Sequence, residues 1–255
     1  MSSCLFLGTG SSMGVPLIGC NCHICQSENP LNRRLRTSAF LQIRGKNFLI
    51  DVGPDFREQA LRYNIQNIDG ILLTHPHFDH IGGLDDLRIF NFILKKPLPC
   101  LLSGRMYHHL KKRYDHIFQP YKEVGNIAVE FDYQIVEKDF DTVSFLDEKF
   151  SVMTFFQQDL SVSGYRIDDF AYITDIKTFS EEVVESLKGV KTLVLSAPRY
   201  RSSPVHFSVD EALDFITSVG AEKTYLTHLS HDIDMEDHPL PENVFFAYDG
   251  LKITF

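Results

Sequence analysis

Six consecutive residues of this chain contain four side chains that can bind a metal ion, in the segment His75-Pro-His-Phe-Asp-His80. The apolar residues 71–74 come directly before it, so a buried strand would deliver all four side chains into one tight loop. Two alternating histidines can point toward one ion while the following Asp-His pair turns toward a second, and imidazole with carboxylate suits Zn²⁺ or Mn²⁺. A histidine-rich surface loop is the alternative explanation. The candidate ligands are His75, His77, Asp79 and His80.

A site for two ions needs further ligands from other loops, and two residues stand at the ends of other apolar runs. Asp175 follows residues 170–174, and a carboxylate at this place could bridge two ions. His228 has the corresponding place after residues 225–227. Taken alone, each would be better explained as a cap or a loop residue, so their assignment depends on the histidine-rich segment.

Three cysteines, Cys20, Cys22 and Cys25, lie within six residues. Thiolates at this spacing commonly form structural zinc sites that are completed by a ligand from elsewhere in the chain. Buried free cysteines are one alternative. A redox role for the Cys-x-x-Cys pair is another, but no thioredoxin-like βαβ pattern surrounds it. We therefore expect a structural Zn²⁺ and a reducing compartment.

Short apolar and β-branched runs recur along the chain and predict strands. They cover residues 4–7, 39–43, 48–50, 71–74, 129–136, 150–156, 170–174, 192–196, 223–227, 244–247 and 251–255. Amphipathic segments predict helices at residues 54–63, 84–94, 180–187 and 208–219, and a serine suited to capping opens each of the last two. Strands first come in groups and later alternate with helices, so we expect a layered α/β (α+β) sandwich. Its loops at one edge should carry the site, because the polar candidates stand at strand ends.

Length and charge limit the class of protein. The 255 residues fit one large α/β domain, so residues 1–255 are expected to form a single domain. The formal net charge of −9 argues against a protein that holds nucleic acid through its phosphates, which requires a basic face. The N-terminus lacks the basic segment of a signal peptide, and no apolar window approaches the about 18 residues needed to cross a bilayer. We expect a cytoplasmic protein with no membrane or nucleic-acid partner.

Together these motifs resemble the metallo-β-lactamase superfamily, and within it the PhnP-like phosphodiesterases, over nearly the whole chain. The segments that carry the resemblance are Leu7-Gly-Thr-Gly-Ser-Ser-Met-Gly-Val15, Gly19-Cys-Asn-Cys-His-Ile-Cys25, Leu49-Ile-Asp-Val-Gly-Pro-Asp-Phe-Arg57, Leu73-Thr-His-Pro-His-Phe-Asp-His80, Tyr172-Ile-Thr-Asp175 and Leu226-Thr-His-Leu-Ser-His231. The resemblance implies a four-layer αβ/βα sandwich of the metallo-β-lactamase type.

The resemblance also implies a role for each candidate ligand. The first ion would be bound by His75 and His77, and the second by Asp79, His80 and His228. Asp175 would bridge the two ions. His231 would complete the Cys20, Cys22 and Cys25 zinc site.

Two further residues receive roles from the resemblance. His206 matches a family histidine that acts as a proton donor or phosphate contact. The resemblance therefore makes His206 an expected catalytic residue, together with the ligand Asp79. The alternative for His206 is a structural role. Asp51 resembles an aspartate that orients a ligand histidine without binding metal.

One ligand of the family pattern is missing. Family members take a third histidine for the first ion from a loop between the middle strands, but this chain has no histidine between His116 and His206. We expect Gln158 at the matching position. An amide oxygen is a weaker ligand for Zn²⁺ than imidazole, so the first site should bind its ion less tightly or prefer Mn²⁺.

The activity implied by the resemblance is hydrolysis of a small cyclic phosphodiester by a metal-bound hydroxide, with one or two Zn²⁺ or Mn²⁺ ions at the active site. One alternative is an ester, lactone or thioester hydrolase with the same core. The other is a metal-poor homologue without catalysis, which Gln158 keeps open. A homodimer is a further expectation, because Phe90, Phe92 and Ile93 beside the site could line either a pocket or a subunit interface.

Overall fold

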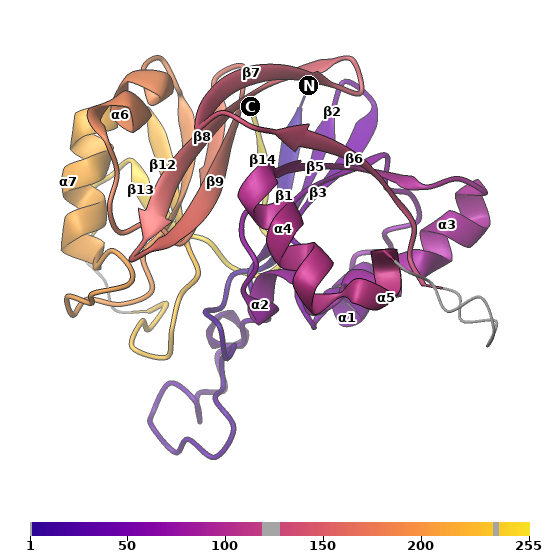
Figure 1. The fold of residues 1–255 in the computed structure, drawn as a ribbon. Coiled ribbons are helices and arrows are strands. Elements are labelled where there is room, and N and C mark those ends of the chain that lie inside the picture. The colour runs from indigo at the N-terminus through magenta and orange to yellow at the C-terminus, as the bar shows by residue number, and fades with distance from the viewer. Residues whose placement is uncertain (1, 119–127, 237–239) are drawn as a thin grey trace.

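Two seven-stranded β-sheets lie face to face in the computed structural model, which describes residues 2–118, 128–236 and 240–255 (Figure 1). Helices cover the outer face of each sheet. The predicted four-layer α/β sandwich is therefore confirmed. No helix within the described ranges is long and apolar enough to cross a membrane.

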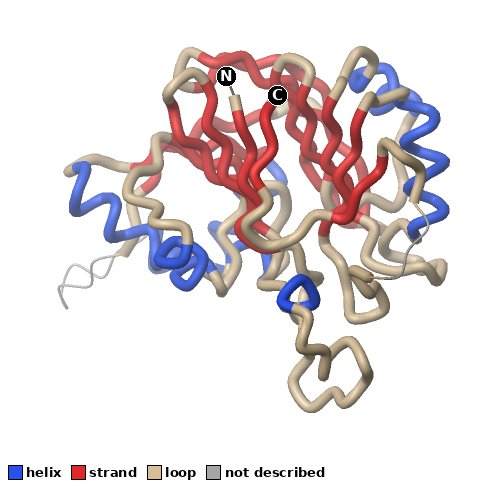
Figure 2. Tube along the Cα trace, turned by 180° about the vertical axis from the view of Figure 1, so that it is seen from behind, coloured by secondary structure: helices blue, strands red, loops and turns tan. Residues whose placement is uncertain are grey.

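The first sheet has the strand order β14-β1-β2-β3-β4-β5-β6. Neighbours from β14 to β3 are antiparallel, whereas β3 to β6 are parallel. The first and last strands of the chain pair at one end of this sheet, as Figure 2 shows. The strands are β1 (Ser3–Gly8), β2 (Ser38–Ile43), β3 (Lys46–Ile50), β4 (Gly70–Leu72), β5 (Leu98–Ser103), β6 (Phe131–Val136) and β14 (Lys252–Thr254).

The second sheet has the strand order β13-β12-β11-β10-β9-β8-β7. It begins as an antiparallel meander from β7 to β10 and continues in parallel from β10 to β13. The strands are β7 (Phe140–Phe145), β8 (Glu148–Gln157), β9 (Leu160–Ile167), β10 (Phe170–Ile173), β11 (Thr192–Ser196), β12 (Lys223–Thr227) and β13 (Val244–Phe246).

Apolar side chains fill the space between the sheets and the space under each helical layer. On β11, Val194 points to the core between the sheets, whereas Leu193 and Leu195 point to the core under α6 (Glu181–Leu187) and α7 (Val209–Val219). A strand covered on both faces needs apolar residues on both, and burial of one such side chain stabilises the fold by about 1.5–3 kcal/mol. A third core lies under α1 (Phe56–Arg62), α3 (Arg88–Leu94) and α4 (Gly104–Arg113).

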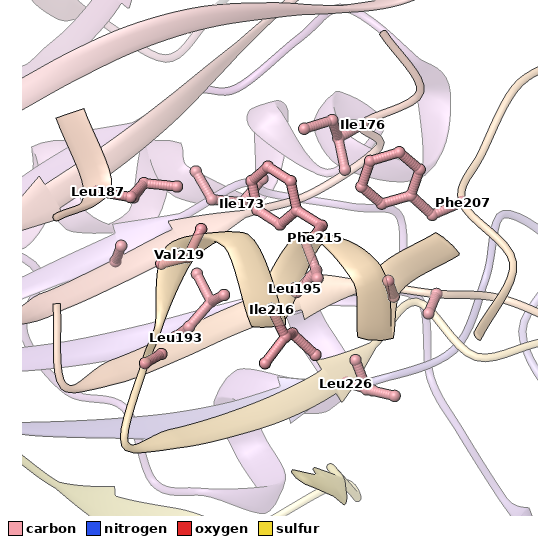
Figure 3. Close-up of a cluster of buried hydrophobic side chains, with 14 of the residues drawn as sticks. Ile173, Ile176, Leu187, Leu193, Leu195, Phe207, Phe215, Ile216, Val219 and Leu226 are labelled. Carbon is pink, nitrogen blue, oxygen red and sulfur yellow. The ribbon is translucent and has the colours of Figure 1, made fainter. Parts of the chain in front are cut away.

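Helix α7 shows how local signals set an element. Its apolar residues recur at helical spacing and pack on the second sheet, with Phe215, Ile216 and Val219 turned toward it (Figure 3). Ser208 and Glu211 form a capping box at its start, and Gly220 ends it with a φ of 74°. The capping predicted at the start of α6 is wrong, because the Ser180 side chain makes no capping hydrogen bond there.

Two short helices complete the described elements around the site. Helix α2 (Phe78–Ile81) begins within the histidine-rich segment, and α5 (Asp115–Phe118) follows α4; two 3-10 turns are η1 (Pro30–Asn32) and η2 (Leu84–Leu87).

Of the apolar residues expected beside the site, Phe90 is buried in the core, whereas Phe92 and Ile93 are 51% and 60% exposed. The homodimer stays a prediction.

Candidate metal centre

The loops that follow four strands bring the candidate ligands to one edge of the sandwich. Asp51 follows β3, the histidine-rich segment follows β4, Asp175 follows β10 and His228 follows β12. Asp51, Asp175 and His228 all have left-handed backbone conformations, with φ of 58°, 56° and 61°. Residues other than glycine rarely adopt this conformation, and such strain gathers at functional sites. The sharp turn ends each strand and directs its side chain into the edge.

Asp175 is the carboxylate around which the other candidate ligands gather. Its Oδ2 lies 3.2 Å from His80 Nε2, and its Oδ1 lies 3.4 Å from His228 Nε2 and 4.0 Å from His75 Nε2. The Asp79 Oδ2 atom lies 3.4 Å from the same atoms of His80 and His228. All five side chains are buried. The structure thus brings together five of the predicted ligands, with the Asp175 carboxylate close to three of the histidines.

The chemistry of His80 shows that this cluster fits a divalent cation. Its Nδ1 donates to Asp51 Oδ2 at 2.6 Å, which turns Nε2 into the cluster, where a bound ion would take the place of the proton on that nitrogen. That Nε2 atom is buried and has no hydrogen-bond partner among the described residues. A buried polar atom without a partner costs about 1–3 kcal/mol, and a bound ion would remove this cost. Three overlapping groups have ligand atoms within 4.8 Å of one another: His75, His80 and Asp175; Asp79, His80 and His228; and Asp175, His206 and His228.

The pKa shifts of the buried ligands also indicate that positive charge is favoured among these side chains. Burial alone would lower the pKa of His80, but the carboxylates of Asp175, Asp79 and Asp51 raise it well above its ordinary value. Burial alone would raise the pKa of Asp79, but His80 and His228 hold it far below its usual range. A divalent ion held by these residues would add positive charge beside the buried carboxylates. Burial lowers the pKa of His75 well below its ordinary value, so its imidazole is neutral, as metal binding requires.

His77 and His206 lie at the edge of the cluster. His77 is half-buried, and its Nδ1 atom is 3.0 Å from His75 Nε2. His206, from the loop between β11 and α7, is buried with its Nδ1 atom 3.5 Å from Asp175 Oδ1. Burial lowers the pKa of His206 to about 4, so its imidazole is neutral at pH 7. The catalytic role expected for His206 stays a prediction.

The position expected to replace the missing histidine is corrected by one residue. Gln158 is exposed in the turn between β8 and β9, with a φ of 53°. Gln157 is buried instead, with its Nε2 atom 3.3 Å from Asp175 Oδ1 and 3.0 Å from His206 Nε2. Successive side chains along a strand point to opposite faces, so a shift of one residue exchanges a buried side chain for an exposed one.

The cysteine site is assembled from two distant parts of the chain. The Sγ atoms of Cys20, Cys22 and Cys25 lie 3.4, 3.4 and 3.5 Å from His231 Nδ1. The four side chains form one group with ligand atoms within 4.8 Å, which fits a tetrahedral Zn²⁺. The Cys22 pKa falls to about 6, mainly because the backbone N–H of Cys25 donates to its sulfur, which favours the thiolate.

Sequence reasoning missed two contacts that hold the histidine-rich loop. Thr74 donates its backbone N–H and its hydroxyl to the two oxygens of Asp51, at 2.8 and 2.7 Å. Arg113, in the last turn of α4, donates to the Pro76 carbonyl at 2.6 Å. The sequence Lys111-Lys112-Arg113 carries no signal of this contact, because the carbonyl that Arg113 reaches is set only by the fold.

Comparison with known proteins agrees with this geometry. Residues 46–229 match the sequence profile of the Beta-lactamase superfamily domain. A crystal structure of a diphosphatase from the PhnP family is 36% identical, has a TM-score of 0.91 and aligns over 100% of this chain and 98% of its own.

Two curated relatives match over different shares of the chain. An octanoyltransferase from Porphyromonas gingivalis is 34% identical over 254 residues, which are 98% of this chain and 51% of that protein. The chain thus spans about half the length of that relative. A ribonuclease Z from Halalkalibacterium halodurans is 32% identical over 58% of this chain and 43% of its own length. Because the domain profile spans most of the chain and the buried His and Asp cluster lies inside it, the chain belongs to the metallo-β-lactamase superfamily of metal-dependent hydrolases.

Proposed function

We propose that this protein is a metal-dependent phosphodiesterase that acts on a small, preferably cyclic, phosphodiester. The observation that carries the proposal is Asp175, a buried carboxylate within 4.0 Å of four histidines from both sheets, namely His75, His80, His206 and His228. The likeness to a PhnP-family diphosphatase and to a ribonuclease Z supports a phosphoester as the substrate. The net charge of −9 favours a small substrate over a nucleic acid.

The residues would divide the work as follows. His75, His80, His228, Asp79 and Asp175 would hold one or two Zn²⁺ or Mn²⁺ ions, with His77 as a further ligand at the edge. A bound ion supplies a hydroxide nucleophile at neutral pH and neutralises charge on the phosphate oxygens. Asp51 orients His80 through its Nδ1 atom.

The mouth of the cluster is suited to a phosphate group. A hollow of about 440 Å³ is lined by Ser12, His77, Gln157 and His206, among others. These side chains can donate hydrogen bonds to non-bridging oxygens, and His206 can pass a proton to the leaving oxygen once it is protonated.

The cysteine site has a structural role in this proposal. A Zn²⁺ held by Cys20, Cys22, Cys25 and His231 would fasten the long loop after β1 to the loop after β12. Reduced cysteine ligands accord with a cytoplasmic location, which stays a prediction.

Gln157 favours a second candidate, a homologue that binds a ligand without hydrolysing it. Its amide takes the place where the family resemblance implies a histidine, so one ion would be held weakly. Hydrolysis of a thioester or lactone by the same core is a further alternative, which parallel assays with a thioester and bis(p-nitrophenyl) phosphate would separate.

The test is metal analysis of protein purified without added metal, together with phosphodiesterase assays in Mn²⁺ and Zn²⁺. We expect Cys22→Ser to lose one zinc, while Cys100→Ala, a buried cysteine of β5, keeps the full metal content. We also expect Asp79→Asn to abolish hydrolysis of bis(p-nitrophenyl) phosphate, while exposed Asp86→Asn retains it. Wild-type protein with a single metal, lost in Cys22→Ser, and no hydrolysis with either supplement would refute the proposal.

A further inference from the structure

A second hollow, of about 690 Å³, opens beside the mouth of the metal cluster. Its walls come from α4, from the connection between β6 and β7 and from the hairpin of β8 and β9. Asp159 and Leu160 line both this hollow and the one at the cluster. The two hollows are therefore neighbours that share part of their lining, and the second one lies next to a substrate held at the cluster. We call this second hollow the α4 groove.

The charges in the α4 groove do not favour a second anionic group. Three cationic side chains and three carboxylates line it, so their formal charges cancel. Arg105 is already engaged by Asp139, with the Nη1 and Oδ1 atoms 2.6 Å apart. A groove that attracts a second phosphate would carry an excess of positive charge, which concentrates the electric field on the ligand. The cationic residues are Arg105, Lys112 and Lys138, and the carboxylates are Glu137, Asp139 and Asp159.

Phe156 gives the groove an apolar surface that is held rigidly. Its side chain is 36% exposed, as expected one residue before the buried Gln157, because side chains alternate along a strand. Its backbone N–H donates to the Thr178 carbonyl at 2.8 Å, and its carbonyl accepts from the N–H groups of Lys177 and Thr178, both at 2.9 Å. The backbone that carries the ring is therefore fixed in place before any ligand arrives, which lowers the entropy cost of binding.

We propose that the α4 groove binds the organic group of the substrate, and that this group is a planar, uncharged ring such as a nucleobase, which rests on Phe156. An aromatic face accepts any flat ring, and the surrounding carboxylates, imidazoles and ammonium groups offer both acceptors and donors to its edge. His108 and His109 of α4 supply the imidazoles. The inference rests on the proposed function only in placing the phosphate at the cluster.

The test compares two ligands that differ only in the ring. Adenosine 5′-monophosphate and ribose 5-phosphate are titrated by calorimetry into the protein as purified. We expect the nucleotide to bind about fivefold more tightly or better, the effect of one base on one aromatic ring. In Phe156→Ala the two ligands should bind alike, with the Kd of ribose 5-phosphate unchanged. Phe245→Ala on β13, a ring exposed to a similar degree at 40%, should keep the preference.

The possible outcomes separate this proposal from the proposed function. Equal affinities in wild-type protein, tighter binding of ribose 1,5-bisphosphate than of the nucleotide, or equal loss of both ligands in Phe156→Ala would overturn it. The comparison in wild-type protein needs no variant to fold. A preference for the nucleotide without phosphodiester hydrolysis would support base binding in the α4 groove and contradict the proposed phosphodiesterase activity. Hydrolysis without that preference would support the activity and contradict base binding.

Discussion

Asp51 lies directly behind the metal cluster and accepts three hydrogen bonds, one from His80 and two from Thr74. It was expected to orient a ligand histidine, and the contact with His80 Nδ1 shows this arrangement. Its φ of 58° means that the strand ends in a strained turn at this residue. The carboxylate is therefore held by the backbone and in turn holds the imidazole.

Asp51→Asn should weaken metal binding without removing a ligand. An amide at this position can present its N–H₂ group to His80, which would reverse the hydrogen bond and favour the wrong tautomer. Loss of such a supporting partner costs about 10–100-fold in metal affinity. Competition with a chromogenic chelator measures the change, and Asp86→Asn, an exposed residue, is the control. An unchanged affinity would show that Asp51 does not support His80.

Gln157→His should add an imidazole where the structure places an amide. We expect about one additional ion per chain, because neutral imidazole is a better ligand for Zn²⁺ than an amide. Gln158→His is the matched control, since that side chain is exposed and should leave the metal content unchanged. Metal analysis by mass spectrometry measures both. If Gln158→His gains the ion instead, the correction of the register is wrong.

At the scale of elements, the loop before β2 is joined to the start of α1 by an ion pair. Asp55 accepts from the backbone N–H of Arg36 at 2.8 Å and from its guanidinium at 2.9 Å. The carboxyl is 14% exposed and the guanidinium 28%. Burial alone would raise the pKa of Asp55, but the hydrogen bonds and charge of Arg36 bring it below its usual value.

Asp55→Asn should lower the free energy of unfolding at pH 7 by about 1–2 kcal/mol, the size of a charge-assisted hydrogen bond. Because the pKa of Asp55 is lower in the folded protein than its unfolded value of about 3.9, the stabilisation is complete above pH 4. It is lost as the pH falls through the folded-state pKa. Urea unfolding of wild type and variant at a series of pH values measures the difference. A difference that grows toward low pH would contradict the assignment.

The elements themselves were predictable where local signals agree. Strands β11 and β12 were predicted with their observed limits, because each is a β-branched and apolar run with a clear end. Strand β5 was missed because Pro99 within it argues against a central strand. Strand β9 was missed because of its polar residues and Gly164. A Cβ at Gly164 would lie 2.5 Å from the Ile173 side chain, so a larger residue here would displace side chains of the core.

At the scale of the whole molecule, the metal cluster joins the two sheets. The histidine-rich segment follows β4 of the first sheet. Asp175, His206 and His228 follow strands of the second sheet. The core between the sheets also takes side chains from both, including Phe48 and Phe150, whose ring centroids are 5.3 Å apart. We propose on this basis that residues 1–255 form a single domain.

This arrangement predicts one cooperative thermal transition that depends on bound metal. A ligand at a hundredfold excess over its Kd adds about 2.7 kcal/mol, so chelation should lower the Tm by about 5–10 °C. Calorimetry with and without a chelator measures the shift. His228→Ala should show a smaller shift, because one of the ligands is already absent. Two separate transitions would contradict a single domain.

The amino-acid sequence by itself revealed the histidine-rich segment and the cysteine cluster, because the candidate ligands in each lie within a few residues of one another. Asp175 and His228 were candidates because each follows an apolar run, but their exact roles and the role of His231 came from a family resemblance, since spacing alone cannot show which distant loops meet. Only the tertiary structure decided that Gln157, and not Gln158, faces Asp175, and that Phe156 stands exposed in the α4 groove. The physical reason is that side chains alternate along a strand, so a single residue of register at the end of β8 decides which of them enters the site.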